Sequence, residues 1–130
     1  MPIGLENLKI YTMAEELELW VFNLTKGFPK DEKYRSVDQL RRSSSSVSNN
    51  IAEAYNKRSY KEKIHILHDI AKSEAEETKC NLMVCFKKEF HCDREIVGKY
   101  TELLKAISGY ISFLHKKKHR KTYKLTNLKT

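Results

Sequence analysis

The chain has 130 residues, a third of them charged, with only four glycines and two prolines. This length suits a single domain with its own core, and the composition favours long helices over a turn-rich β-sandwich. No apolar run approaches the roughly 20 residues that span a bilayer, and the N-terminus lacks the order of a secretory signal. The three cysteines form no CxxC pair, which favours reduced thiols. We therefore expect a cytoplasmic protein without a membrane span.

The net charge of +8 is unevenly distributed. Residues 116–130 hold seven of the 25 basic residues and none of the 17 acidic ones. Residues 1–115 therefore carry 18 basic against 17 acidic residues and are almost neutral. The high isoelectric point belongs to the C-terminal segment, and such a segment favours an acidic partner.

The first predicted helix begins at Thr12, whose side chain is expected to cap it while Glu15 reaches back. Gly27 is expected to end the helix in the left-handed conformation, Pro29 cannot continue it, and Phe28 folds back onto it. Its apolar stripe is formed by Ile10, Met13, Leu17, Trp20, Val21 and Leu24.

The second predicted helix has a capping box from Ser36 to Gln39. Its apolar period continues through the serine run 43–46, so this run is expected to be helical rather than a linker, with small side chains that let two helices approach closely. The inward stripe is Val37, Leu40, Ser44, Val47, Ile51 and Ala54.

A third box, Ser59 to Glu62, opens a long predicted helix that runs to Lys88, and Asp93 caps a fourth. The inner positions of the third helix are Ile64, Leu67, Ala71, Ala75, Thr78, Leu82 and Cys85. Those of the fourth are Ile96, Val97, Tyr100, Leu103, Leu104, Ile107, Ile111 and Leu114. The short connections predict an antiparallel, up-down-up-down four-helix bundle over residues 1–117. Residues 118–130 show no sustained period and are expected to form a disordered basic tail.

Helices one and three carry apolar residues outside their main stripes, which is typical of a surface between subunits. These residues are Leu19, Phe22, Ile66, Ile70, Val84 and Phe86. They predict a homo-oligomer.

A block around the second helix follows a known family pattern. The matching residues are Phe28, Pro29, Glu32, Gln39, Leu40, Arg41, Arg42, Ser46, Val47, Asn50, Ile51, Ala52 and Glu53. In this pattern the chain resembles the four-helix proteins encoded by intervening sequences within bacterial 23S ribosomal RNA genes, over about residues 8–115. The resemblance implies a left-handed up-down bundle that forms rings, commonly pentamers. Nucleic-acid binding is suspected for this family, and a related accessory protein of diversity-generating retroelements works by binding partners.

Two positions depart from the family pattern. Ala54 and Asn56 stand where the family commonly has glycines. The second helix is therefore expected to end less sharply, which weakens the case for a close backbone approach to a partner at this turn.

The sequence offers no active site, cofactor site or metal site. Glu62 and His65 form half of a di-iron motif whose second half is missing. The other histidines and the cysteines lack the paired spacing of zinc ligands, and there is no glycine-rich phosphate loop. We therefore expect a protein that is not an enzyme.

Basic residues suggest binding of RNA or DNA, with Tyr55 and Tyr60 available for base stacking. The candidate contacts are Arg41, Arg42, Lys57, Arg58, Lys61, Lys63, Lys116, Lys117, Lys118, Arg120 and Lys121. An ordinary solvated face is the alternative for those in the bundle, and a plain end or a membrane-surface segment for those in the tail. A protein-interaction scaffold without nucleic-acid binding is the alternative function.

Asn50 and Glu53 lie beside the predicted seam of the second helix. They are expected either to satisfy a helix end or a neighbouring subunit, or to form part of a binding notch.

Overall fold

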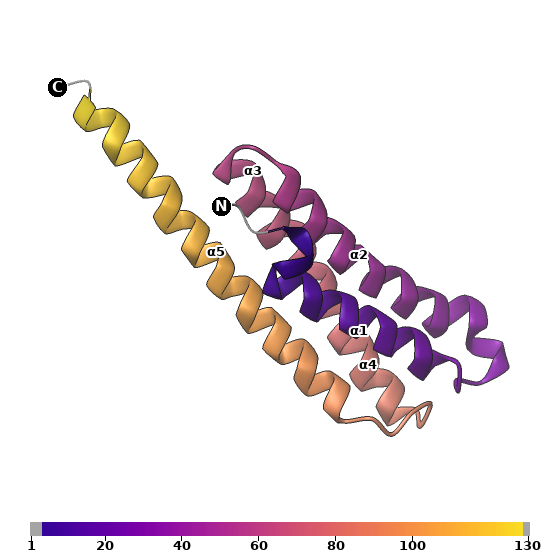
Figure 1. The fold of residues 1–130 in the computed structure, drawn as a ribbon. Coiled ribbons are helices and arrows are strands. Elements are labelled where there is room, and N and C mark those ends of the chain that lie inside the picture. The colour runs from indigo at the N-terminus through magenta and orange to yellow at the C-terminus, as the bar shows by residue number, and fades with distance from the viewer. Residues whose placement is uncertain (1–3, 129–130) are drawn as a thin grey trace.

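A computed structural model describes residues 4–128 as an all-α bundle (Figure 1). Its four rods are α1 (Lys9–Thr25), α2 (Asp38–Asn56), a third rod made of α3 (Tyr60–His65), η4 (Ile66–Ala71) and α4 (Lys72–Lys87), and α5 (Glu95–Leu128). The short turns are η1 (Leu5–Asn7), η2 (Lys30–Glu32) and η3 (Lys33–Val37). Successive rods run in opposite directions, and the four-helix bundle is confirmed.

The contacts between rods place them at the corners of a square. α1 packs against α2 and α5, and the third rod packs against the same two helices. α1 and the third rod therefore lie at opposite corners. The outer sides of α1 and α4 therefore point away from each other.

The inward stripe of α2 is buried along its whole length, as predicted, from Val37 to Ala54. The serine run is helical, and Ser44 is only 1% exposed. Ser43 is also buried and accepts a hydrogen bond of 2.7 Å from the Thr78 hydroxyl on α4. Small side chains at this point let the two helices approach closely while their hydroxyls remain satisfied.

The predicted ends of α1 are wrong in detail. The helix begins at Lys9, so Thr12 lies inside it and donates its hydroxyl hydrogen bond to the Leu8 carbonyl at 3.0 Å. A threonine with a carbonyl four residues behind it satisfies itself there instead of capping. Gly27 does not adopt a positive φ. Tight hydrogen bonds close the helix end instead, and Phe28 folds back into the core as expected.

The predicted capping box at Ser36 is also wrong. η3 is a π-helical turn with a kink at Arg35, and it leads directly into α2, which begins at Asp38 without a side-chain cap. Because the residues around Ser36 are already in a helical turn, no free helix start is left for its hydroxyl to cap.

The third rod starts as predicted, since the Ser59 hydroxyl accepts a hydrogen bond from the Glu62 amide at 3.1 Å. It is interrupted by η4, a π-helical segment. A π turn contains an extra residue, which shifts the faces of the helix before and after it. Ile66, predicted to lie outside the main stripe, is the first residue of this segment and is buried together with Leu67, whereas Ile70 stays exposed.

Asp93 caps the last helix, as predicted, by accepting a hydrogen bond from the Ile96 amide at 3.1 Å. The expected disordered tail from residue 118 is not confirmed, because α5 continues to Leu128. Extending an existing helix adds a hydrogen bond per residue without a new nucleus, and Lys and Arg are good helix formers. Among residues 4–122, whose burial is described, Leu114 is the last buried residue. About 20 Å of helix therefore projects beyond the bundle. Residues 129 and 130 lie outside the described part.

Among the helices of residues 4–128, none combines the length and apolar character that a membrane span requires.

Candidate nucleic-acid interface

The structure brings two basic segments, far apart in the sequence, to one end of the bundle. α2 ends and α3 begins at this end, and α3 packs against α5. The projecting part of α5 starts there as well (Figure 1). Arg58 in the connection between α2 and α3, Lys61 on the first turn of α3, and the basic residues from Lys116 to Lys121 therefore lie at the same end of the bundle.

An aromatic cluster lies between these segments. Tyr110 and Phe113 of α5 stack with their ring centroids 5.9 Å apart, and the Lys117 ammonium lies 5.5 Å from the Phe113 ring. Burial raises the pKa of Tyr110, and the nearby phenols of Tyr55 and Tyr60 raise it further. The tyrosines from the α2–α3 region and the rings from α5 therefore form one group.

Sequence reasoning missed Tyr110 and Phe113. Both lie on the last turns of α5 before the basic segment, close to Leu114, and the period of the helix assigns neither to the inner stripe. Phe113 is 49% exposed. An exposed aromatic residue next to a basic run was the signal that could have identified it.

Lys63 has a structural role and does not point to a free phosphate site. Its ammonium donates hydrogen bonds to the carbonyls of Tyr55 at 2.8 Å and Ala54 at 3.3 Å. Partial burial lowers its pKa. A cation on the last carbonyls of α2 gives these carbonyls the hydrogen-bond donors that the helix itself does not supply, and its charge interacts favourably with the negative end of the helix dipole.

The other basic residues of the turn differ in their exposure and in their distance from acidic side chains. The Lys57 ammonium lies 3.9 Å from the Glu53 carboxylate one helical turn before it. Arg58 and Lys61 are exposed. Up to residue 122, the exposed cations of the projecting segment are Lys116, Lys118, Arg120 and Lys121, and Lys117 is half-buried.

Arg41 and Arg42 do not belong to this end. They lie near the start of α2, about 24 Å along the helix from Lys57. Arg41 donates hydrogen bonds to the Thr25 hydroxyl at 2.9 Å and to the Phe22 carbonyl at 3.2 Å. Its guanidinium also covers the Phe22 ring at 4.3 Å. Arg41 therefore closes the C-terminal end of α1.

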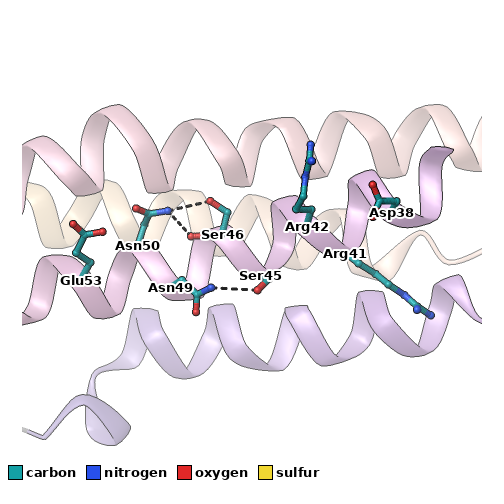
Figure 2. A pocket seen from close by; sticks show the side chains of 8 residues that line it. All are labelled: Asp38, Arg41, Arg42, Ser45, Ser46, Asn49, Asn50 and Glu53. Carbon is teal, nitrogen blue, oxygen red and sulfur yellow. Dashed lines mark hydrogen bonds between the residues drawn. The ribbon is translucent and has the colours of Figure 1, made fainter. Parts of the chain in front are cut away.

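Arg42 points the other way, toward α4, as Figure 2 shows. Burial and the nearby Glu77 carboxylate raise the pKa of Glu74 on α4, and the charge of Arg42 acts in the opposite direction. The two adjacent arginines thus serve opposite neighbours of α2.

An open hollow of about 570 Å³ follows the outer side of α2 (Figure 2). It is lined by Asp38, Arg41, Arg42, Ser45, Ser46, Asn49, Asn50 and Glu53. Asn50 donates to the Ser46 carbonyl at 2.7 Å and to its hydroxyl at 3.0 Å. Asn50 thus satisfies its own helix, while Glu53 is exposed. The other family-motif polar residue, Gln39, lies 3.5 Å from Glu77 on α4.

Histidines and cysteines form no metal site among the described residues. His65 and His68 both bond through Nδ1 to the Asp69 carboxylate, at 2.6 and 2.8 Å. These hydrogen bonds, that of His68 first, lower the pKa of Asp69.

Comparisons with known proteins agree with this architecture. The sequence pattern of the family described as "23S rRNA-intervening sequence protein" matches residues 6–113. A crystal structure of a protein of unknown function from the S23 ribosomal protein family of Bacteroides thetaiotaomicron superposes with a TM-score of 0.70. The two are 29% identical, over 78% of this chain and 97% of that one. No protein with a curated description matches this chain.

Proposed function

The chain belongs to the family of 23S rRNA-intervening sequence proteins, and we propose that it is a non-enzymatic, homo-oligomeric protein that binds RNA or DNA through the basic end of its bundle. The observation that carries this proposal is that Arg58 and Lys61 lie at the same end of the bundle as the basic projecting part of α5, beside an aromatic cluster in which the Phe113 ring is exposed.

The electrostatics of this end suit a polyanion. Between residues 115 and 128 there are six basic residues and no acidic one. Along a helix of about 20 Å this amounts to a positive charge every 3–4 Å or so. A surface of this kind binds phosphates by releasing their counterions, without reading sequence. The bundle is nearly neutral and does not oppose the approach.

The aromatic cluster adds contacts that phosphates do not provide. Phe113 is half exposed and has Lys117 over its ring. An unpaired base that stacks on such a ring contributes about 1–3 kcal/mol. The arrangement therefore favours single-stranded nucleic acid over a duplex, whose bases are already stacked.

Self-association is supported by apolar side chains that remain exposed on two opposite corners. Leu19 and Phe22 on α1 are 58% and 44% exposed, and Met83 and Val84 on α4 are 41% and 46% exposed. Because these corners face away from each other, a contact between α1 of one copy and α4 of the next is heterologous. Such contacts close into rings when the rotation between copies allows it. The pentamer that the family resemblance implies is an assembly of this type.

The test is a salt titration of fluorescent single-stranded RNA binding. We compare the full chain, a chain ending at His115, and an Arg58→Glu, Lys61→Glu variant. Removal of one phosphate contact should lower the slope of log K against log salt by about 0.7. Because the truncation removes all seven basic residues that follow His115, it should nearly abolish the salt dependence. The double variant should reduce affinity by a smaller factor.

A Lys30→Glu, Lys87→Glu variant is the matched control, since it makes the same charge change at the opposite end of the bundle. If this variant weakens binding as much as the Arg58, Lys61 variant, net charge rather than the basic end governs binding. If the full chain fails to bind at low salt, the nucleic-acid proposal is wrong and a protein-binding scaffold takes its place.

A further inference from the structure

The outer face of α2 carries a charge pattern that is complementary to itself when the helix is reversed. In chain order the face presents Asp38, Arg42 and Glu53, which line the hollow, and then Lys57, the residue that follows the last turn of α2, with polar residues between them. In an antiparallel pair of such helices with its two-fold axis between residues 47 and 48, Asp38 lies opposite Lys57 of the second copy. In the same register Arg42 lies opposite Glu53. Each of these four charges then lies opposite one of the other sign. Arg41, which also lines the hollow, is held on α1 by its hydrogen bonds to Thr25 and Phe22 and takes no part.

The middle of this face allows two helices to approach closely. Ser45, Ser46 and Asn49 occupy it, and in the antiparallel register Ser46 lies opposite Asn49 of the second copy. These small side chains leave the open hollow of about 570 Å³ seen in Figure 2. Helix axes 8–10 Å apart are usual for helix pairs, and small side chains favour the lower end of this range.

We propose that α2 pairs with α2 of a second copy of this chain, antiparallel about that two-fold axis, with the hollow as the contact surface. The charge pattern of the face identifies a second copy of α2 as the partner. A general basic or acidic ligand would satisfy only half of the four charged positions, whereas the same helix reversed satisfies all of them. Arg42 and Glu53 are exposed. The ion pair of Glu53 with Lys57 of its own chain is long, at 3.9 Å, and lies at the surface, so a cation of the second copy competes for the same carboxylate.

This contact is separate from the one proposed for α1 and α4. It is isologous, since the same patch serves both copies, and its charged residues lie on α2. Combined with a ring through α1 and α4, it would join copies that belong to two different rings. It does not depend on nucleic-acid binding.

The experiment uses charge exchange in full-length protein that also carries Phe22→Asp, so that the contact through α1 is disabled. Arg42→Glu places two acidic side chains opposite each other at both ends of the pair, and Glu53→Arg places two basic ones there. Each variant should raise the dimer Kd by about tenfold or more at low salt. An equimolar mixture of the two should dimerise again, because the acidic side chain introduced in one copy then meets the basic side chain introduced in the other. Native mass spectrometry distinguishes the mixed dimer by mass.

Lys61→Glu and Glu102→Arg are the controls, because they make the same charge changes on exposed positions of other helices. They should leave the dimer intact. The proposal is overturned if Phe22→Asp protein is monomeric at about 100 μM, if Arg42→Glu and Glu53→Arg leave the mass unchanged, or if their mixture stays monomeric. None of these results bears on RNA binding, which is measured with the Arg58 and Lys61 variants.

Discussion

Arg41 was expected to contact phosphate, but its contacts predict that Arg41→Met will cost stability instead. The guanidinium donates hydrogen bonds to the Thr25 hydroxyl and the Phe22 carbonyl and covers the Phe22 ring. All three contacts join α2 to the last turn of α1.

The size of the effect follows from how well each contact can be replaced. The Phe22 carbonyl bond is exposed, so water can take the place of the donor. The Thr25 bond is partly buried, but the Thr25 hydroxyl keeps its own hydrogen bond to the Val21 carbonyl at 2.8 Å. A partly buried hydrogen bond from a charged group contributes about 1.5 kcal/mol, and an exposed cation–π contact about 0.5 kcal/mol. Methionine retains part of the packing. We expect a loss of about 1–2 kcal/mol, or roughly 4–8 °C in Tm for a domain of this size.

The assay is urea and thermal unfolding followed by circular dichroism, with RNA binding measured on the same samples. Arg58→Met is the matched control, because Arg58 is exposed and lies at the proposed interface. Arg41→Met should destabilise the fold without changing RNA affinity, and Arg58→Met should do the reverse. If Arg41→Met leaves the midpoint unchanged and weakens RNA binding, the structural role argued for Arg41 is wrong.

Three further changes test the core and one end of the bundle. Ser44→Leu should overpack the bundle core, in which Ser44 is buried, and cost about 1–3 kcal/mol of unfolding free energy. Ser45→Leu, on the outer face, should cost little, and equal losses would mean that the register is misplaced. Burial, with a smaller effect of a nearby carboxylate, raises the pKa of Tyr100. The folded state therefore holds this proton more tightly than the unfolded chain. The contribution of this group to the free energy of unfolding should be full below about pH 10 and be lost as the pH rises above it. Tyr100→Phe should flatten this alkaline loss in urea titrations, and an unchanged slope would contradict it. Asp93→Ala removes the cap of α5 and the acceptor of the 2.8 Å hydrogen bond from the Trp20 indole. It should lower the free energy of unfolding by about 2 kcal/mol and change the fluorescence emission of the tryptophan. Unaltered emission would show that this hydrogen bond does not persist in solution.

Much of the fold could be predicted because it depends on side-chain periodicity. The stripe from Leu40 to Ala54 marks the buried face of α2, and its regular spacing predicted that the serine run is helical, as the structure shows. The capping roles of Ser59 and Asp93 could be predicted because each precedes a helix that follows a non-helical connection.

The missed details share a cause in the backbone around them. Thr12 and Ser36 carry the capping signal, but each is preceded by residues that are already helical, and a local motif does not show this. Ile66 is the first residue of the π-helical turn η4 and is buried beside Leu67, and a regular helical period does not represent such a turn.

The sequence by itself determined the four helices, the buried stripes and the concentration of positive charge near the C-terminus, because each depends on residues that are neighbours in the chain. Only the tertiary structure decided what each cation does. Arg41 and Lys63 are held on the ends of α1 and α2, whereas Arg58 and Lys61 are left exposed beside the projecting part of α5. The same side-chain chemistry serves a helix end or solvent according to which carbonyls the packing brings within reach. These distances are set between helices that are remote in sequence.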